Sequence, residues 1–269
     1  MKTGSALIQD IDNCILPKGT MAFWWLGQLG YAVKLGETVI YLDAFLSEMK
    51  GRNIPPLLKP EEVTNADYIF GSHDHIDHID RGVWYQLSIS SPKAKFIVPK
   101  LLINKLSREI NIPEDRFIGL DDGASEITST LKISAIAAAH EFLDQDPDTG
   151  SFPYLSYIIE GNDCIIYHSG DTCIYEGMLS KLKKWDKFRV AFVPINGRDA
   201  KRYRTNIIGN MTYQEAADLA GSLKPKLTVP GHYEMFNDTQ DPALFVDYLD
   251  AKYPGLQCWV GEHGEKVTV

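Results

Sequence analysis

Three histidines and two aspartates occur within six positions, where the chain reads His73-Asp74-His75-Ile76-Asp77-His78. In an extended or tightly turning segment, residues two apart share a face, so His73 and His75 can bind one metal ion together. Asp77 and His78 follow one short turn later and can reach a second ion roughly 3.5–4 Å away, the spacing of two-metal hydrolytic sites. Because imidazole is the commonest metal ligand and this segment holds three of the chain's seven histidines, we predict a metal site.

A dinuclear site needs more ligands than this motif supplies, and suitable residues recur after later apolar runs. His140 follows the run 133–139, Asp171 follows the run 165–170, and His232 follows the run 227–231. Loops at the ends of strands are where sites are commonly assembled, so we expect these residues to join the motif. His168, three residues before Asp171, is expected to support the ligands from outside, since outer partners fix ligand orientation.

A basic cluster in this acidic chain follows the apolar run 190–195 and consists of Arg198, Lys201, Arg202 and Arg204. Guanidinium groups match the geometry of phosphate and carboxylate groups, so the cluster indicates an anionic substrate. Arg198 and Arg204 are our candidates for contacting that substrate. A solvated surface cluster without a ligand is the other interpretation.

The composition limits the classes of function. The 269 residues include 36 acidic and 27 basic ones, and the net charge of −9 argues against a general nucleic-acid binder or a protein of anionic membranes. No apolar stretch approaches the about 18 residues of a membrane span, and charged residues interrupt the first twenty positions. We expect one domain over residues 1–269, in a cytoplasmic protein that acts on a small molecule. The oligomeric state is left open, with a homo-oligomer among the alternatives.

Short apolar runs rich in β-branched and aromatic residues predict strands. They lie at 22–26, 31–35, 38–42, 68–70, 95–98, 131–138, 155–160, 164–167, 190–195, 226–229 and 257–260. Helical spacing occurs at 100–108, 174–184, 212–223 and 242–252, and Thr212 with Glu215 forms a capping box at a helix start. Segments 141–153 and 196–210 are expected to be loops. Strands cluster first and then alternate with helices in each half, which predicts two packed sheets flanked by helices. Alternation along 22–26 would send Trp24 and Trp25 to opposite faces.

The ordered set H-x-H-x-D-H, His, Gly-Asp and Gly-His resembles the metallo-β-lactamase-fold hydrolases over nearly the whole chain. The resemblance implies an αββα sandwich with the site at one edge between the sheets. It also implies a set of ligands for each of two metals and one bridging ligand. The first metal would be bound by His73, His75 and His140, the second by Asp77, His78 and His232, and Asp171 would bridge them. Asp77 and Asp171 would then be the catalytic carboxylates.

A narrower likeness is to L-ascorbate-6-phosphate lactonase and its relatives. It rests on the stretches Lys18 to Gly27, Ser72 to Asp80 and Tyr167 to Asp171. The likeness implies a lactone or ester of a small, phosphorylated, carbohydrate-like molecule as substrate. It favours manganese, whereas zinc is the default of the wider fold and iron is compatible with the same imidazole and carboxylate ligands.

Our leading hypothesis is therefore a hydrolase in which two cations lower the pKa of a shared water toward 7. A phosphodiesterase on the same site is the close rival. An iron-dependent persulfide dioxygenase is a second alternative, which the full second set of ligands disfavours. A structural metal domain is a third, but structural zinc sites have four ligands and are rich in cysteine.

Overall fold

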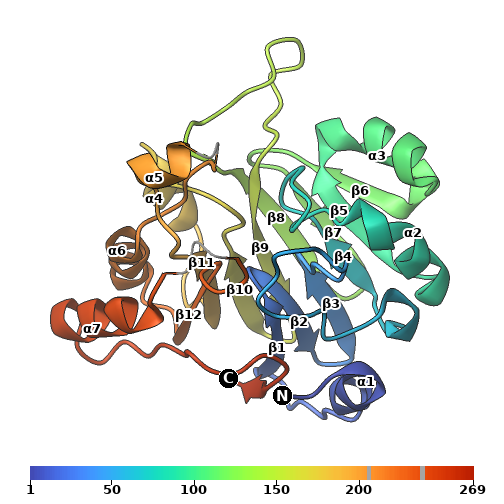
Figure 1. Cartoon of the computed structure of the whole chain (residues 1–269), viewed down its shortest axis with the longest axis horizontal. Coiled ribbons are helices and arrows are strands. Elements are labelled where there is room, and N and C mark those ends of the chain that lie inside the picture. The colour runs from blue at the N-terminus through green and yellow to red at the C-terminus, as the bar shows by residue number, and fades with distance from the viewer. Residues whose placement is uncertain (205–206, 237–239) are drawn as a thin grey trace.

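Two β-sheets packed face to face form the centre of the molecule, and helices cover the outer face of each sheet (Figure 1). This computed structural model describes residues 1–204, 207–236 and 240–269. The first sheet has the strand order β13-β1-β2-β3-β4-β5-β6, so the last strand of the chain lies at its edge beside β1. The second sheet has the order β12-β11-β10-β9-β8-β7. The predicted αββα sandwich is confirmed.

The elements have the following bounds. The first sheet consists of β1 Met21–Gly27, β2 Gly30–Leu35, β3 Thr38–Leu42, β4 Tyr68–Phe70, β5 Lys95–Pro99, β6 Phe117–Leu120 and β13 Lys266–Thr268. The second sheet consists of β7 Ser125–Ile127, β8 Lys132–Ala137, β9 Leu155–Gly161, β10 Cys164–His168, β11 Val190–Pro194 and β12 Leu227–Gly231. The helices are α1 Gly4–Asp12, α2 Arg81–Ser90, α3 Ile103–Ile110, α4 Met178–Leu182, α5 Ala200–Tyr203, α6 Tyr213–Leu223 and α7 Pro242–Lys252.

Parallel pairing in both sheets creates the edge at which polar residues gather. In the first sheet β3, β4 and β5 are parallel neighbours, and in the second sheet β10, β11 and β12 are. Ligands of open α/β sheets bind outside the carboxyl ends of parallel strands. Asp43 directly follows β3, His73 follows β4, and His232 directly follows β12, so both sheets deliver chemically active side chains to such ends.

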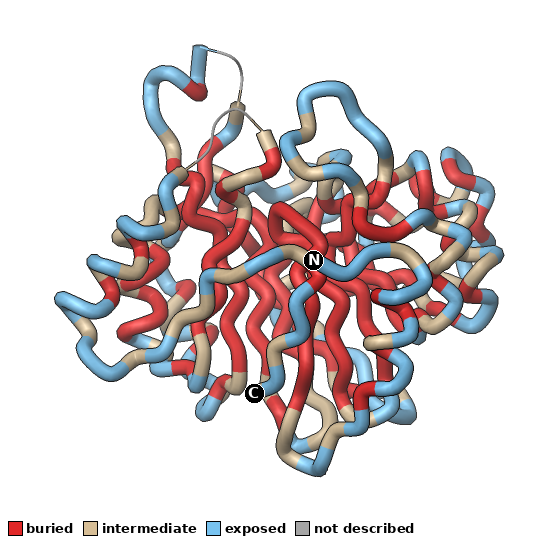
Figure 2. Tube along the Cα trace, turned by 60° about the horizontal axis from the view of Figure 1, so that its bottom comes forward, coloured by how far each residue is buried: buried red, intermediate tan, exposed pale blue. Residues whose placement is uncertain are grey.

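Two hydrophobic clusters hold the layers together. The larger one lies between the sheets and continues beneath α4, α6 and α7, and Phe192 packs edge-on against Phe23 across the sheet interface at 5.2 Å between ring centroids. The smaller one joins the first sheet to the helices of the first half of the chain. Trp25 belongs to the first cluster and Trp24 to the second, so the predicted alternation is confirmed. Figure 2 shows most of the strands buried and the outer helical turns exposed.

Ten of the predicted strands occur, and one does not. At 257–260 the structure has only an isolated bridge between Thr228 and Cys258. The ladder cannot continue along β12 because Pro230 has no N–H to donate. The predicted helix at 174–184 is reduced to α4, since Gly177 adopts a left-handed φ of 87° immediately before it. The capping box is confirmed: Thr212 N donates to Glu215 Oε2 at 2.9 Å, and Glu215 N donates to Thr212 Oγ1.

Helices α1, α2 and α5 and strands β6, β7 and β13 were not predicted. Helix α2 has no side-chain hydrogen bond at its N-cap, because the Asp80 carboxylate instead accepts hydrogen bonds from Ser47 and Leu46. Helix α5 lies within the predicted loop 196–210, of which residues 205 and 206 are outside the described ranges. In the described parts of the chain, every helix is too short or too polar to cross a membrane.

Candidate metal centre

The histidine-rich segment between β4 and α2 folds into tight turns. His75 N donates to the His73 carbonyl at 3.0 Å, and His78 N donates to the His75 carbonyl at 3.1 Å. Successive turns of this kind direct side chains two and three positions apart into one space. His73 and His78 are almost fully buried there, with 1 % of each residue exposed.

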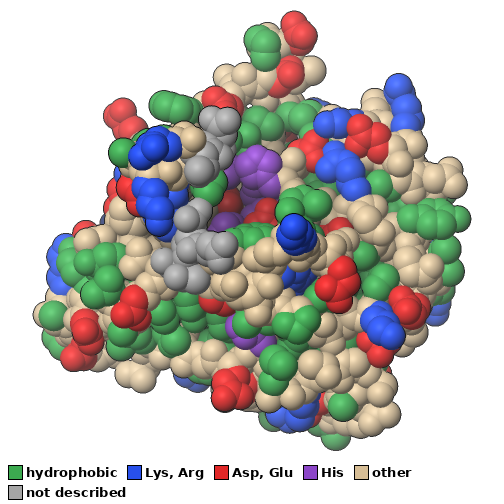
Figure 3. Space-filling model, in the orientation of Figure 1, with side chains coloured by type: hydrophobic (Ala, Val, Ile, Leu, Met, Phe, Trp, Pro, Cys, Tyr) green, Lys and Arg blue, Asp and Glu red, His purple; other side chains and the backbone are tan. Residues whose placement is uncertain are grey.

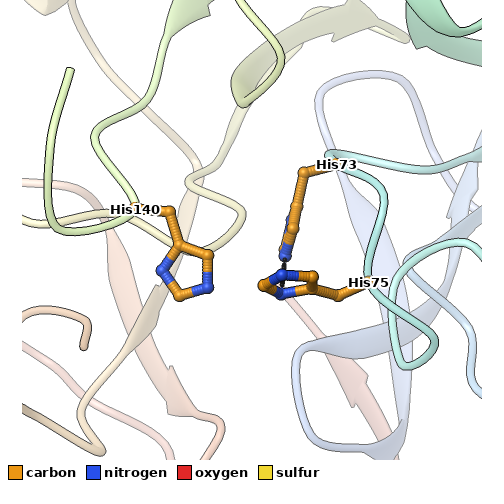
Figure 4. A group of neighbouring side chains, drawn as sticks. All are labelled: His73, His75 and His140. Carbon is orange, nitrogen blue, oxygen red and sulfur yellow. Dashed lines mark hydrogen bonds between the residues drawn. The ribbon is translucent and has the colours of Figure 1, made fainter. Parts of the chain in front are cut away.

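The first ligand group consists of His73, His75 and His140, and Figure 4 shows their rings directed toward one another. One ligand atom from each lies within 4.8 Å of the others. His73 Nε2 is 2.9 Å from His75 Nδ1, while His140 comes from the turn after β8 on the other sheet. This group therefore spans both halves of the sandwich.

The second ligand group consists of Asp77, His78 and His232, whose ligand atoms also lie within 4.8 Å of one another. Asp77 Oδ2 is 3.6 Å from His78 Nε2 and 3.3 Å from His232 Nε2. Since His232 directly follows β12, this group too requires both sheets.

Asp171 lies between the two groups. Its Oδ1 is 3.4 Å from His78 Nε2, and its Oδ2 is 3.2 Å from His232 Nε2 and 3.6 Å from His140 Nε2. Two carboxylate oxygens facing members of both groups is the arrangement that a bridging ligand needs. The structure thus brings together all seven residues that the family resemblance implied as ligands.

Two glycines explain why the motifs read Gly-Asp and Gly-His. Gly170 has a φ of 55°, and a Cβ atom there would lie 2.7 Å from Ser72 Cβ and 2.9 Å from the Leu155 carbonyl. A Cβ atom on Gly231 would lie 2.8 Å from the Gln28 carbonyl oxygen. Only glycine lets the backbone approach so closely just before Asp171 and His232.

Asp43 is a functional residue that the sequence interpretation missed. It is fully buried with a left-handed φ of 39°, and its Oδ2 lies 2.7 Å from His78 Nδ1. Its carboxylate also accepts hydrogen bonds from the Ser72 backbone and hydroxyl. Holding Nδ1 of His78 in this way leaves Nε2 free to face the ligand groups. The available signal was an acidic residue immediately after the buried strand 38–42.

His168 acts through Asp43. Its Nε2 is 2.9 Å from Asp43 Oδ2, and the ring is fully buried. Burial alone would raise the pKa of Asp43, but His168 and His78 hold it far below its usual range. His168 therefore contacts Asp43, and Asp43 contacts the ligand His78, so His168 supports the ligands indirectly.

His140 is oriented by the segment that follows β11. Its Nδ1 lies 3.1 Å from the Gly209 carbonyl, so Nδ1 donates and Nε2 faces Asp171. The adjacent Glu141, at a φ of 70°, accepts hydrogen bonds from Gly209 N and from the Tyr203 hydroxyl. Non-glycine residues with positive φ are uncommon, and they concentrate at functional sites.

The residues present fit divalent cations. Nε2 of His78, Nε2 of His232 and Oδ1 of Asp171 are buried without a hydrogen-bond partner among the described residues. The two ring nitrogens face the Asp171 carboxylate at 3.4 and 3.2 Å. Burial would lower the pKa of His232, yet Asp171 and Asp77 raise it to about 10. The carboxylates thus stabilise positive charge at this point, and imidazole with carboxylate and no thiolate suits zinc, manganese or iron.

A cavity of about 320 Å³ opens above the ligands, and Figure 3 shows histidine side chains at the base of a hollow on this face. Its described lining is Gln28, His75, Asp77, His140, Asp171, Asn196, Arg202, Ile207, Ile208, His232, Tyr233, Glu234, Met235 and Phe236. Arg198 is absent from this described lining and forms a bidentate pair with Glu215 at 2.7 Å. Arg204 is exposed and likewise absent from it. Contact of Arg198 and Arg204 with a substrate stays a prediction, whereas Arg202 reaches the cavity wall.

Comparison with known proteins agrees with this geometry. Residues 38–233 match the family described as the beta-lactamase superfamily domain. A UPF0173 metal-dependent hydrolase of Sulfurisphaera tokodaii is 29 % identical over 249 residues, which cover 91 % of this chain and 98 % of that protein. A UPF0173 metal-dependent hydrolase of Thermococcus kodakarensis is 30 % identical over 222 residues, covering 82 % and 88 % respectively.

The solved structures include Igni18, described as a novel metallo hydrolase of Ignicoccus hospitalis, with a TM-score of 0.70 and 23 % identity over 93 % of this chain and 98 % of that one. At this identity the likeness shows the fold. The narrower likeness to ascorbate-6-phosphate lactonase receives no support from these relatives. The chain belongs to the metallo-β-lactamase superfamily and, within it, to the UPF0173 family of metal-dependent hydrolases.

Proposed function

We propose that this metal-dependent hydrolase uses two divalent cations to hydrolyse a small ester or lactone that carries an anionic group. The observation that carries the proposal is the position of Asp171, whose two oxygens face both ligand groups at 3.2–3.6 Å. A carboxylate shared by both ligand groups suits two neighbouring ions that share a ligand better than two ions in separate sites. Manganese and zinc are the ions we favour, and iron fits the same ligands.

The bound cations would supply an activated water and polarise the carbonyl oxygen of the substrate. The side chains of the protein would position the water and the substrate. Asp77 and Asp171 line the cavity floor, where their oxygens can accept a hydrogen bond from the attacking water and hold it in line with the substrate. Asp43 and the Gly209 carbonyl keep His78 and His140 in fixed orientations, so the ligand atoms need little rearrangement.

Arg202 is our candidate for the residue that holds the anionic group. It is the one arginine or lysine in the described lining, and only 9 % of it is exposed. Asp199 holds Arg202 through two hydrogen bonds. The Arg202 backbone N donates to Asp199 Oδ1 at 2.9 Å, and Arg202 Nη1 donates to Asp199 Oδ2 at 2.8 Å. A buried guanidinium held in this way in the cavity wall can orient a carboxylate or phosphate.

The test is a hydrolysis screen with the purified protein after chelator treatment and reloading with Mn²⁺ or Zn²⁺. The panel contains sugar-phosphate lactones, their unphosphorylated forms, simple carboxylic esters, bis-nitrophenyl phosphate and cyclic nucleotides. We expect metal-dependent opening of a lactone or ester, faster when the substrate carries an anionic group. Turnover confined to the phosphodiesters would replace this proposal with the phosphodiesterase alternative, and oxygen uptake with a persulfide would replace it with the dioxygenase.

A further inference from the structure

Gln28, in the turn between β1 and β2, contacts two members of the second ligand group, Asp77 and His232. Its side-chain Nε2 donates to Asp77 Oδ2 at 3.0 Å, and its backbone carbonyl accepts from His232 N at 3.0 Å. We infer that Gln28 is a positioning residue for the second metal, and that its carboxamide sets the orientation of Asp77. The inference rests on the two-cation function proposed above.

The contact has the geometry expected of an outer partner of a ligand. Asp77 Oδ2 is the oxygen nearest His78 Nε2 and His232 Nε2, so it is the one that would face an ion. Each carboxylate oxygen has two lone pairs, and the Gln28 hydrogen bond occupies one while the other remains available. Without this donor, the Asp77 carboxylate could rotate about its terminal torsion, which is broad and weakly restrained.

The Gln28 backbone is itself firmly held. Its N–H donates to Glu234 Oε1 at 2.8 Å, and its carbonyl also accepts from Trp25 Nε1 at 3.0 Å. Glu234 in turn lies 3.1 Å from His263 Nε2, and the His263 ring stacks on Trp25 with centroids 3.9 Å apart. These contacts fix the point from which the carboxamide extends to Asp77.

The backbone conformation argues that the side chain is present for this contact and not for the turn. Gln28 has a φ of 52°, in the left-handed region that glycine and asparagine adopt with less strain. Only 3 % of the residue is exposed, so the glutamine contributes little to solvation. A glutamine at this position is explained if its side chain must be long enough to reach Asp77.

Substitutions at Gln28 can separate its contact with Asp77 from its place in the turn. Gln28→Asn keeps the amide and suits the turn, but it is one methylene shorter and withdraws the donor from Asp77. Gln28→Met keeps the length and removes the donor. Chelator-stripped protein is titrated with Mn²⁺, and free Mn²⁺ is followed by electron paramagnetic resonance. We expect both variants to bind the second equivalent roughly 10- to 100-fold more weakly, with the first equivalent unchanged.

Asn196→Ala is the matched control, because Asn196 is another amide of the cavity lining and its side-chain oxygen accepts from Asn210 at 3.1 Å. It should leave both Mn²⁺ equivalents unchanged. Unchanged affinity for the second equivalent in Gln28→Asn, with thermal unfolding unaffected or improved, would mean that Gln28 serves only the turn and would overturn the inference. Wild-type protein that binds a single equivalent would instead overturn the proposed two-cation function. If Gln28→Met does not fold, Gln28→Asn alone decides.

Discussion

The floor and the outer wall of the cavity are built in different ways. The floor consists of the ligand residues His75, Asp77, His140, Asp171 and His232, and the ligands His73 and His78 belong to the same two groups. Buried partners such as Asp43 and the Gly209 carbonyl orient these side chains. The outer wall consists of Arg202, Ile207, Ile208, Tyr233, Met235 and Phe236, which lie on two connecting segments after β11 and β12. Ile208 is 38 % exposed, whereas Asp171 is 3 % exposed.

From this difference we expect the two parts of the site to determine different properties. Side chains held by several buried hydrogen bonds have one arrangement, so we expect the floor to determine the reaction type. Connecting segments vary more easily than the elements they join, so we expect the wall to determine which substrate is accepted. The following experiments alter the floor first and the wall last, in order of expected effect.

Replacing Asp171 with Asn should have the largest effect, because it removes the carboxylate that faces both ligand groups. We expect the hydrolytic rate to fall by roughly three orders of magnitude or more, which corresponds to the several kcal/mol that metal-assisted chemistry supplies. Metal content per chain, measured by mass spectrometry, should fall for both equivalents. Asp146→Asn, in the exposed loop between β8 and β9, is the control, and equal losses in both variants would contradict the bridging role.

Replacing Asp43 with Asn should have the next largest effect. Asparagine tolerates the left-handed φ of 39° at this position, so the backbone is preserved while the charge that orients His78 is lost. We expect metal affinity to fall roughly 10- to 100-fold, measured by competition with a chromogenic chelator. Unaltered affinity would show that the fold alone orients His78.

The pH dependence of metal binding tests the floor without a mutation. Burial alone would lower the pKa of His232, but Asp171 and Asp77 raise it from 6.5 to about 10 in the metal-free protein. This raised pKa stabilises the metal-free fold fully below pH 6.5, and the contribution is lost as the pH rises toward 10. A metal needs the neutral ring, so binding at pH 7.5 should release protons and strengthen by up to about tenfold per pH unit.

Calorimetry in buffers with different ionisation enthalpies measures this proton release directly. The metal-free protein should also unfold at progressively lower temperature between pH 7 and 10, a trend that bound metal suppresses. Binding at pH 7.5 without proton release would show that His232 is already neutral before the metal arrives.

Replacing Arg202 with Met should have the smallest effect and only on substrate selection. Loss of a charge-assisted hydrogen bond to an anionic substrate is worth about 1.5 kcal/mol, so KM should rise roughly tenfold for anionic substrates. KM for an uncharged ester and the metal content should stay the same. Arg108→Met, at an exposed position of α3 outside the described cavity lining, is the matched control. Equal changes for charged and uncharged substrates would assign Arg202 a structural role.

The sequence allowed the floor to be predicted because its ligands fall at the ends of regular strands. His73, Asp171 and His232 follow β4, β10 and β12, and parallel pairing brings the carboxyl ends of such strands together. His140 also follows an apolar run, although its strand β8 is antiparallel to its neighbours. Asp43 occupies an equivalent place, but a single acidic residue without a motif carries too weak a signal. The wall was not predictable in the same way. Arg198, Arg202 and Arg204 are the same residue type within seven positions, and the fold of the segment around α5 brings Arg202 into the described cavity lining.

The same reasoning explains the errors in the fold. Weak helix formers occupy seven of the ten positions of helix α2, and its position depends on burial of Val83, Trp84 and Leu87 against the first sheet. Strand β7 has three exposed residues and exists through its pairing with β8. Such elements are stabilised by tertiary contacts, which local sequence patterns do not reveal.

The order of the ligands along the chain has a consequence for biosynthesis. His73, His75 and His140 leave the ribosome well before Asp171, and His232 comes last, directly after the strand that closes one edge of the second sheet. A nascent or proteolytically shortened polypeptide that stops anywhere between residues 171 and 232 carries the first ligand group and Asp171 without the completed second group. Such chains lack His232 and part or all of the last strands of the second sheet, so we expect them to have no hydrolytic activity.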